Sequence, residues 1–393
     1  MKLLIISHTA HYMSSEGELV GWGPTLREID HLTTLFDIVY HCAPLHEGDA
    51  PSSSIAYEMK EKVHFIPLAP SGGVSFLDKL GVLKKAPGNL AIVRKALKEA
   101  DVYQFRAPTG IGVYLIPWLK WFSGKPGWFK YAGNWVQKNA PIGYRVQRWM
   151  LKRFNRQRVT INGSWPGQQE HCVTFENPCL TQSEIELGRE IVEQKDYNGF
   201  INFCFVGRLQ SAKGVGHILE AFKKIGPHPR IGEIHLIGDG PEKDLFIEKS
   251  KDLDVSVIFH GFVTRQEVGE MLKKCHLFLL PSASEGFPKV VAEAANYGCV
   301  PLVSDVSSLS QYIMDGENGF LVRYNEKIAN ELADKIMEIL SLNDLKKISR
   351  QAYKLSPKFS YDYYIKRIDC DIIAPISDIE KNRETFNQSV QRK

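Results

Sequence analysis

The chain has 393 residues, of which 44% are hydrophobic and 24% are charged; this is an ordinary globular composition and excludes a low-complexity chain. The net charge of +4 is too small to indicate nucleic-acid binding, so no nucleic-acid partner is expected. The seven cysteines are odd in number and form no CxxC pair, which favours reduced thiols and a cytoplasmic location.

Short apolar and β-branched runs recur through the first half of the chain, mostly separated by segments long enough for a helix. They occupy residues 2–7, 36–42, 63–69, 101–107, 129–134, 158–163 and 172–177. This alternation predicts parallel strands joined by helical crossovers. The first run is too short for a signal peptide or a membrane span.

Polar residues follow several of these strands. A long loop, HTAHYMSSEGELVGWG, is expected after the first strand, with Gly21 and Gly23 near its end and the next helix starting at Pro24 or Thr25. Arg106 follows the strand DVYQF, and Asn134 lies in YAGNW. Both of these residues sit at carboxyl ends of predicted strands, where open α/β sheets bind ligands.

Two stretches are compatible with a membrane surface. One is YLIPWLKWFSGKPGWF (114–129), and the other is the basic run RVQRWMLKRFNRQR (145–158), which contains no acidic residue. A basic amphipathic helix can lie on anionic lipid, whereas the alternative is a crossover helix with a solvated face. For residues 114–129 a buried core position is the favoured interpretation. A peripheral contact at the inner membrane face therefore stays open.

The polar stretch Leu180–Gly199 is expected to form a helix and a turn, and the linker between the two domains is placed within it, at residues 186–200. The strand–helix alternation restarts after it. The predicted strands of the second half are residues 201–207, 233–239, 256–262, 276–282, 299–305 and 319–324. The chain therefore divides into a first α/β domain, the linker, a second α/β domain, a tyrosine-rich crossover segment and a polar tail. The boundaries are 1–185, 186–200, 201–355, 356–375 and 376–393.

The segments that follow the strands of the second domain carry groups suited to a pyrophosphate. Arg208 and Lys213 follow the first strand; arginine binds phosphate oxygens bidentately and lysine adds a point charge. A helix beginning near Pro288 would direct free N–H groups at the same place. Glu285 precedes that helix and Glu293 lies more than one turn inside it, so the two carboxylates would suit hydroxyl groups on either side of the phosphates.

The segments FVGRLQSAKGV, IGDGP, FHGFV, SEGFPKVVAEA and DGENGFLV, in this order and spacing, resemble retaining glycosyltransferases of family 4, whose signature is a Glu-x7-Glu pair. The resemblance is dense from Asn202 to Val322 and thinner before it. It implies the GT-B fold, with two doubly wound Rossmann-like domains facing across a cleft and a C-terminal helix crossing back. The first domain would bind the acceptor, and the second a nucleotide-sugar donor.

The resemblance also implies roles for individual residues. Arg208 and Lys213 would stabilise the leaving diphosphate, Glu285 would contact the donor sugar and Glu293 the ribose. Further expected donor contacts come from the backbone near Gly238, His260, Gly261, Phe287, Pro288 and Lys289, and from the glycine-rich loop with Gly21 and Gly23. Many relatives carry a histidine near Arg106, so Arg106 and Asn134 are candidates for orienting the sugar or acceptor.

The implied reaction is metal-independent, needs no cofactor besides its nucleotide-sugar substrate, and proceeds by front-face attack with the leaving phosphate as base. A UDP-sugar is the first expectation and GDP-mannose the second, with a saccharide or lipid-linked saccharide as acceptor. Two alternatives stay open: a nucleotide-sugar 2-epimerase, and a non-catalytic sugar-nucleotide-binding scaffold. A dinucleotide dehydrogenase is disfavoured because no GxGxxG follows the first strand.

Overall fold

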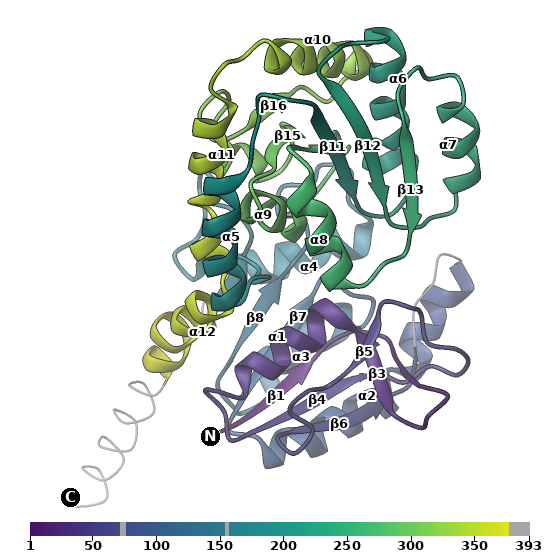
Figure 1. Cartoon of the computed structure of the whole chain (residues 1–393). Coiled ribbons are helices and arrows are strands. Elements are labelled where there is room, and N and C mark those ends of the chain that lie inside the picture. The colour runs from purple at the N-terminus through teal and green to yellow at the C-terminus, as the bar shows by residue number, and fades with distance from the viewer. Residues whose placement is uncertain (71–75, 154–156, 377–393) are drawn as a thin grey trace, which may run out of the picture. The chain divides into compact units, whose positions relative to one another are not determined.

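The computed structural model describes residues 1–70, 76–153 and 157–376, which fall into two compact units (Figure 1). Unit 1 comprises Met1–Phe175 and the chain from Tyr361 onward, and unit 2 comprises Glu176–Ser360. Each unit contains a parallel β-sheet with helices packed on it. The prediction of two doubly wound Rossmann-like domains is therefore confirmed.

The main sheet of unit 1 has seven parallel strands among the described residues, in the order β10-β9-β8-β7-β1-β4-β6. The strands are β1 (Lys2–Ile6), β4 (Ile38–Pro44), β6 (Val63–Leu68), β7 (Val102–Ala107), β8 (Gly127–Tyr131), β9 (Val159–Ile161) and β10 (Cys172–Thr174). Every residue of β7 and β8 is buried, as expected for parallel strands covered on both faces.

The helices of unit 1 pack on both faces of this sheet. They are α1 (Gly23–Leu32), α2 (Phe76–Glu99), α3 (Gly112–Phe122), α4 (Ile142–Arg153) and α12 (Tyr361–Ile368), the last continuing into a π-helical turn (Asp369–Ile373). Leu4 and Ile6 of β1 belong to one apolar cluster, while Leu3 and Ile5 belong to another. This alternation follows from the two-residue period of a strand.

The prediction of a long glycine-rich loop after the first strand is wrong. The chain there forms strands of a second, small sheet. Its antiparallel strands are β2 (His11–Met13), β3 (Leu19–Trp22) and β5 (Ser54–Ala56), in the order β2-β3-β5. Gly21 lies within β3, where a Cβ atom would come 2.8 Å from the ring of the buried His11. Helix α1 starts at Gly23, one residue before the expected Pro24.

The tyrosine-rich segment near the C-terminus returns to unit 1. Tyr361 stacks on His31 with 3.8 Å between ring centroids, and Tyr364 and Ile368 join the core cluster that contains Leu3. Their spacing of three and four residues is that of one helical face. The polar tail expected from residue 376 lies, apart from Ile376, outside the described residues.

Unit 2 contains a parallel sheet of six described strands in the order β13-β12-β11-β14-β15-β16. Its strands are β11 (Ile201–Val206), β12 (Ile231–Ile237), β13 (Val257–Gly261), β14 (Leu277–Leu280), β15 (Val300–Ser304) and β16 (Phe320–Val322). Its helices are α5 (Gln182–Gln194), α6 (Val215–Ile225), α7 (Lys243–Ser250), α8 (Arg265–Lys274), α9 (Lys289–Asn296), α10 (Ile328–Leu340) and α11 (Leu345–Tyr353). Short 3₁₀ turns cover Ser211–Lys213, Leu309–Gln311 and Ser356–Phe359.

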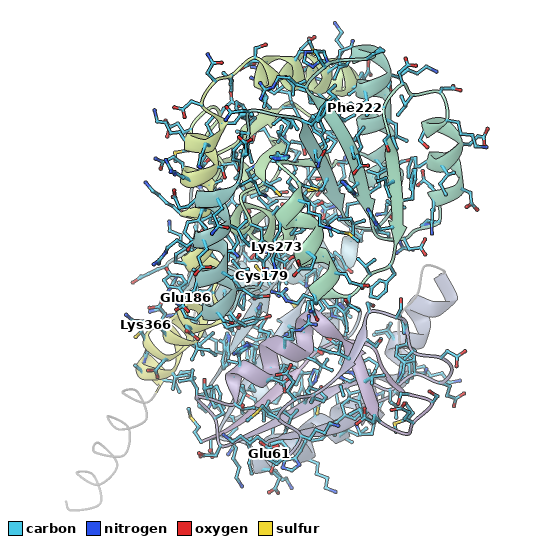
Figure 2. The ribbon with its side chains drawn as sticks, in the orientation of Figure 1. Glu61, Cys179, Glu186, Phe222, Lys273 and Lys366 are labelled. Atoms are coloured by element: carbon cyan, nitrogen blue, oxygen red, sulfur yellow. The ribbon has the colours of Figure 1, made fainter. Side chains whose placement is uncertain are left out.

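A single apolar cluster forms the core of unit 2. Phe222 of α6, labelled in Figure 2, packs edge-on against Phe203 of β11 with 4.9 Å between ring centroids. Six of the seven cysteines of the chain are buried, as expected for small core residues, but Cys370 is exposed.

The expected linker over residues 186–200 instead lies inside unit 2, where most of α5 occupies it. Ile185 and Val192 face the core, and the helix begins with a capping box between Thr181 and Glu184. The boundary between the units lies earlier, after Phe175, and the chain leaves unit 2 after Ser360. The helix expected within Leu180–Gly199 is therefore confirmed, whereas the domain boundary placed there is wrong.

Candidate functional site

The candidate site of unit 2 lies at the carboxyl ends of β11 and β14, which are neighbours in the sheet. The segments after these strands are joined by a hydrogen bond from Ala283 N–H to the carbonyl of Ala212, at 3.0 Å. One residue further along the first segment, Lys213 Nζ lies 2.6 Å from Glu285 Oε1. Two residues selected from the sequence, 72 positions apart, therefore form an ion pair.

Burial distinguishes the two members of this pair. The side chain of Glu285 is 8% exposed, whereas that of Lys213 is 29% exposed. A buried carboxylate needs a nearby cation, so Lys213 satisfies Glu285 while keeping part of its own surface toward solvent. An incoming anion can therefore reach Lys213.

Gly214 allows these two segments to approach each other. Its φ of +85° lies in the left-handed region, and a Cβ atom there would lie 2.2 Å from the carbonyl oxygen of Pro281. Since real Cβ atoms do not approach a carbonyl so closely, only glycine fits this position. The geometry of the Lys213–Glu285 pair thus depends on the residue between the 3₁₀ turn and α6.

The segment after β11 is also tied to the one after β12. Leu209 N–H donates to Asp239 O at 2.9 Å, and Ser211 N–H donates to Glu242 Oε1 at 2.9 Å. Gly238 N–H donates to Gly261 O at 2.8 Å, so these two predicted residues are also brought together. The ends of β11, β12, β13 and β14 form one continuous edge of backbone and charge.

His260 is expected to contribute backbone to this edge, and its ring has a partner of its own. His260 Nε2 lies 3.0 Å from His235 Nδ1, and the two rings are stacked. Burial lowers the pKa of both rings below the usual histidine value; for His235 the neighbouring His260 adds to the effect. The His260 ring thus has a structural partner in His235, and the contribution expected of His260 at this edge is its backbone.

Arg208 is exposed, and in the part of unit 2 that the structure describes its side chain makes no hydrogen bond or ion pair. It lies two residues after the end of β11 and five residues before Lys213. A guanidinium in this position offers a planar set of donors to an anion at the same edge. Together, Arg208 and Lys213 supply two cations against one buried carboxylate.

Helix α9 starts at this edge with Pro288 as its N-cap, so the prediction of a helix beginning near Pro288 is confirmed. The N-cap proline offers no side-chain hydrogen bond to the first turn, and the start of a helix favours an anion. The ring of Phe287 stacks on Phe359 at 4.5 Å and is buried. Phe287 can therefore contribute only its backbone to the site, and Lys289 is the first helical residue.

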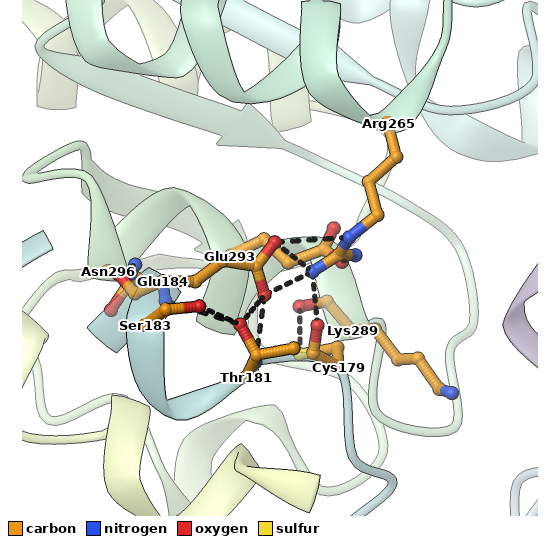
Figure 3. Close-up of polar contacts among 8 residues, drawn as sticks. All are labelled: Cys179, Thr181, Ser183, Glu184, Arg265, Lys289, Glu293 and Asn296. Carbon is orange, nitrogen blue, oxygen red and sulfur yellow. Dashed lines mark hydrogen bonds and ion pairs between the residues drawn. The ribbon is translucent and has the colours of Figure 1, made fainter. Parts of the chain in front are cut away.

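Glu293, on the second turn of α9, is bound by a residue that sequence reasoning missed (Figure 3). Arg265 NH1 donates to Glu293 Oε1 at 2.5 Å, and its NH2 donates to both carboxylate oxygens of Glu184, at 2.7 and 2.8 Å. Arg265 is the first residue of α8, directly after the N-cap Thr264, whose capping box with Glu267 begins the helix. The Thr–x–x–Glu pattern of this capping box predicts a helix start after β13, and this pattern could have pointed to Arg265 from the sequence.

In unit 1, Arg106 lies in a buried ion pair rather than pointing into open space. Its NH2 donates to Glu28 Oε1 at 3.0 Å and its Nε to Gln104 Oε1 at 2.8 Å. Lys130 and Tyr364 donate to the same Glu28 oxygen, at 2.6 and 2.9 Å. These contacts give Arg106 a structural partner, so we leave it out of the proposed site.

Asn134 has the geometry of a turn-forming asparagine. Its Oδ1 accepts the N–H of Val136 at 3.1 Å, and its carbonyl accepts a bond from Arg148 at 3.1 Å. When an asparagine side-chain oxygen accepts a hydrogen bond from the N–H two residues ahead, the chain forms an Asx-turn, which stabilises the loop itself.

Gly23, the other predicted residue at the start of α1, lies close to the backbone just before β5. A Cβ atom at this position would lie 3.3 Å from the carbonyl oxygen of Ser53.

These features define the class of fold. Two Rossmann-like units, each with a parallel sheet, make up the GT-B architecture, and solved GT-B structures align with the chain along nearly its whole length. The Anabaena protein HepE, solved in complex with UDP, aligns with a TM-score of 0.66 and 17% identity over 94% of this chain and 98% of its own. A lipopolysaccharide outer core galactosyltransferase, WaaB, aligns with a TM-score of 0.64 and 18% identity over 94% and 98%. At these identities the likeness shows the fold.

Unit 2 contains the part of the chain that matches a family model. Residues 189–355 match the family model described as glycosyl transferases group 1, and this range lies wholly inside that unit. An uncharacterized glycosyltransferase of Methanocaldococcus jannaschii is 29% identical over 181 residues, or 45% of this chain and 48% of its own. An Escherichia coli UDP-Gal:alpha-D-GlcNAc-diphosphoundecaprenol alpha-1,3-galactosyltransferase is 29% identical over 160 residues, or 38% and 41%. The matched region thus spans half or less of the length of these relatives.

Proposed function

We propose that the protein is a retaining, metal-independent glycosyltransferase of family 4 that moves a sugar from a nucleoside-diphosphate donor to a hydroxyl group. The observation that carries the proposal is the edge of the unit 2 sheet, where Arg208, Lys213 and the uncapped start of α9 offer positive charge beside the buried carboxylate of Glu285. A diphosphate bearing a sugar combines the two chemistries that this edge can bind, anion and hydroxyl.

In the proposed reaction the sugar–phosphate bond breaks while the acceptor oxygen bonds to the same face of the anomeric carbon. The departing diphosphate takes the acceptor proton. Arg208 and Lys213 stabilise the charge that develops on the diphosphate, and the first N–H groups of α9 add to that field. Glu285 accepts hydrogen bonds from the donor sugar and Glu293 from the ribose. These cations replace the charge that a metal would supply, so EDTA should leave turnover unchanged.

We propose a UDP-sugar as the first donor candidate and GDP-mannose as the second, with a saccharide or lipid-linked saccharide of a surface polysaccharide as acceptor. Two comparisons support this order. The fold matches HepE, which was solved with UDP and with UDP-glucose, and a similar Escherichia coli enzyme uses UDP-galactose and a diphosphoundecaprenol-linked acceptor.

A thermal-shift panel of nucleotides and nucleotide sugars tests the donor. We expect the nucleoside diphosphate of one base to raise the melting temperature. The corresponding nucleotide sugar should raise it further, because it contacts both the proposed ribose site at Glu293 and the proposed sugar site at Glu285. The donor is then incubated alone and with extracted saccharide acceptors. Interconversion of donor sugars without acceptor would favour the 2-epimerase, and binding with no transfer to any acceptor would favour the non-catalytic scaffold.

We also propose a peripheral contact of unit 1 with anionic lipid, through the end of α3 and the outer face of α4. Trp121 and Phe122 were expected in the core but are 61% and 71% exposed, and Ile142 and Trp149 of α4 are 77% and 56% exposed. Neither helix contains an acidic residue. No described helix is long and apolar enough to cross a bilayer. Exposed aromatic rings beside lysine and arginine fit the interface of an anionic membrane.

The basic side chains of α4 divide between the surface and the interior. Arg148 is buried and donates to backbone carbonyls, including that of Gln137 at 2.7 Å, so it supports the fold. Arg145, Lys152 and Arg153 are exposed and supply the surface charge. Residues 154–156, also part of the basic run, lie outside the described residues.

Vesicle sedimentation tests this contact. We expect binding to vesicles of phosphatidylglycerol and phosphatidylcholine, none to phosphatidylcholine alone, and loss of binding in Trp149→Ser and Phe122→Ser. Phe200→Ser is the matched control, because Phe200 is an equally exposed aromatic residue (68%) of unit 2. If Trp149→Ser and Phe122→Ser bound the anionic vesicles as well as Phe200→Ser and the wild type do, the proposed lipid contact would be contradicted.

A further inference from the structure

Arg265 lies between two carboxylates of unit 2, and its contacts use all three guanidinium nitrogens (Figure 3). NH1 donates to Glu293 Oε1 at 2.5 Å, while Nε and NH2 donate to Glu184 Oε1 at 3.2 and 2.7 Å. NH2 also donates to the backbone carbonyl of Cys179. A planar guanidinium held by Glu184 and by the carbonyl of Cys179 has little rotational freedom, so it fixes the Glu293 carboxylate that NH1 binds.

Glu184, which binds Arg265, is itself held in place by further hydrogen bonds. Glu184 Oε2 accepts the N–H of Thr181 at 2.8 Å as part of the capping box of α5, so its carboxylate cannot swing away. Helix α5 is anchored on α9 by a bond from Asn296 Nδ2 to Glu184 O at 2.9 Å. Gly188 permits this close packing, since a Cβ atom there would lie 2.5 Å from Asn296 O.

The location of Arg265 is unfavourable for a cation by itself. It is the first residue of α8, where the helix dipole disfavours positive charge. The two carboxylates offset this cost, and the three side chains are only 18–27% exposed. Two acids against one base leave the group with an excess of hydrogen-bond acceptors.

Glu293 carries that excess. Oε1 is bound by Arg265, whereas Oε2 accepts no hydrogen bond from any residue in the described ranges. Each carboxylate oxygen can accept two hydrogen bonds. Glu293 therefore keeps acceptor capacity on both oxygens, while Arg265 restricts its orientation.

We propose that Arg265 is a positioning residue of the donor site: it holds Glu293 so that the carboxylate meets the two vicinal hydroxyls of the donor's ribose. This inference rests on the proposed function, in which Glu293 binds that ribose. An unrestrained glutamate would lose rotamer freedom on binding, and a carboxylate already held by Arg265 avoids much of that loss. Arg265 thus acts through Glu293 and does not touch the substrate.

The test compares a ribonucleotide with its analogue lacking both hydroxyls. Isothermal titration would use UDP and 2′,3′-dideoxy-UDP, or the GDP pair if the thermal-shift panel selects guanine. We expect Arg265→Ala to lower the affinity for the ribonucleotide about tenfold, the scale of one hydrogen bond to a charged group, and to leave the affinity for the dideoxy analogue unchanged. Glu293→Ala should do the same, and the double variant should lose no more than Glu293→Ala alone.

Arg350→Ala is the matched control, because Arg350 forms another arginine–glutamate pair of unit 2, with Glu193, on the surface. It should leave both affinities unchanged. If Arg265→Ala does not fold, Arg265→Lys keeps the charge without the planar fork and should show a smaller loss confined to the ribonucleotide.

The outcomes separate the inference from the proposed function. Equal loss for ribonucleotide and dideoxy analogue, or no loss for either, would overturn the role of Arg265 while leaving a nucleotide site in place. Wild-type protein that binds both nucleotides equally would remove the ribose role of Glu293 and, with it, that of Arg265. Wild-type protein that binds neither nucleotide would overturn the donor site itself.

Discussion

At the scale of single residues, the pair of Lys213 and Glu285 sets a competition within the proposed site. The lysine neutralises a carboxylate that is 8% exposed, and an arriving diphosphate would draw the same lysine toward itself. Glu285 then loses part of its compensation unless sugar hydroxyls replace it. Binding of the sugar and binding of the diphosphate are therefore coupled through one side chain.

Glu285→Gln tests this coupling. We expect the affinity for UDP to stay the same or rise, because Lys213 no longer has a competing anion, whereas sugar transfer should fall roughly a hundredfold, as when one well-placed electrostatic group is removed. Calorimetric titration and initial rates measure the two effects. Glu220→Gln is the control, since Glu220 pairs with Lys224 on the exposed face of α6. Normal turnover of Glu285→Gln would contradict its assignment.

Sequence reasoning found Lys213 and Glu285 because each follows a recognisable strand, and parallel strands bring their carboxyl ends to one edge. It did not find the partners of Arg106. Glu28 lies 78 residues before Arg106 on a helix, and nothing in the local pattern of either segment connects them. Arg265 was missed for the same reason, as its two carboxylates lie on α5 and α9.

At the scale of elements, the turn between β11 and α6 is held by a close approach of backbones. Gly214 is the residue at which this turn touches the segment after β14, and its left-handed φ of +85° closes the 3₁₀ turn that carries Lys213. The position of the cation is thus set by the backbone around it and not by the lysine alone.

Gly214→Ala is expected to destabilise unit 2 and to lower transfer together. The left-handed backbone costs a non-glycine residue roughly 1–2 kcal/mol, and the clash at 2.2 Å with Pro281 O should add roughly 1–3 kcal/mol. Gly316→Ala is the control, with φ of +75° and no atom within 4 Å of its built Cβ. Urea unfolding of both variants measures the difference; equal losses would show that the close approach does not matter.

The helices and strands differed in how well the sequence predicted them. The strands of the two large sheets were predicted because each is a compact apolar run, as in LFLL of β14, whose four residues are all buried. Strands β2, β3 and β5 were missed because they are three or four residues long and polar in part. Helix α5 was predicted, but the domain boundary was placed on it because its polar composition resembles that of a linker; the boundary lies after Phe175.

At the scale of the whole molecule, each unit contains histidines with lowered pKa values: His11 and His41 are buried in unit 1, and His276 is partly buried in unit 2. In unit 1, His11 Nε2 lies 2.9 Å from the hydroxyl of Tyr57, which also lies 2.6 Å from His41. Burial lowers the pKa of His11 to about 4 and that of His41 well below its usual value. In unit 2, burial and then the charge of Lys195 lower the pKa of His276 to about 4.

These histidines should make both units sensitive to mild acid. The unfolded chain takes up a proton near pH 6.5, whereas the folded histidine does so only near pH 4, so the unfolded state binds more protons between these values. Stability is therefore fully present above about pH 6.5 and falls as the pH drops toward 4. For His276 the difference in pKa corresponds to about 3 kcal/mol at the acid end.

His276→Asn separates this contribution from the rest. The Nδ1 atom of His276 accepts the N–H of Asn202 at 3.0 Å, a bond that requires an unprotonated nitrogen, and an asparagine oxygen can take the same place without titrating. We expect the variant to lose less stability than the wild type between pH 7 and pH 5 in denaturant unfolding of unit 2, while the acid sensitivity of unit 1, set by His11 and His41, is unchanged. If the two proteins lost stability equally over this interval, the neutral state of His276 would not be a source of the acid response, and the cause would have to lie among the other buried groups.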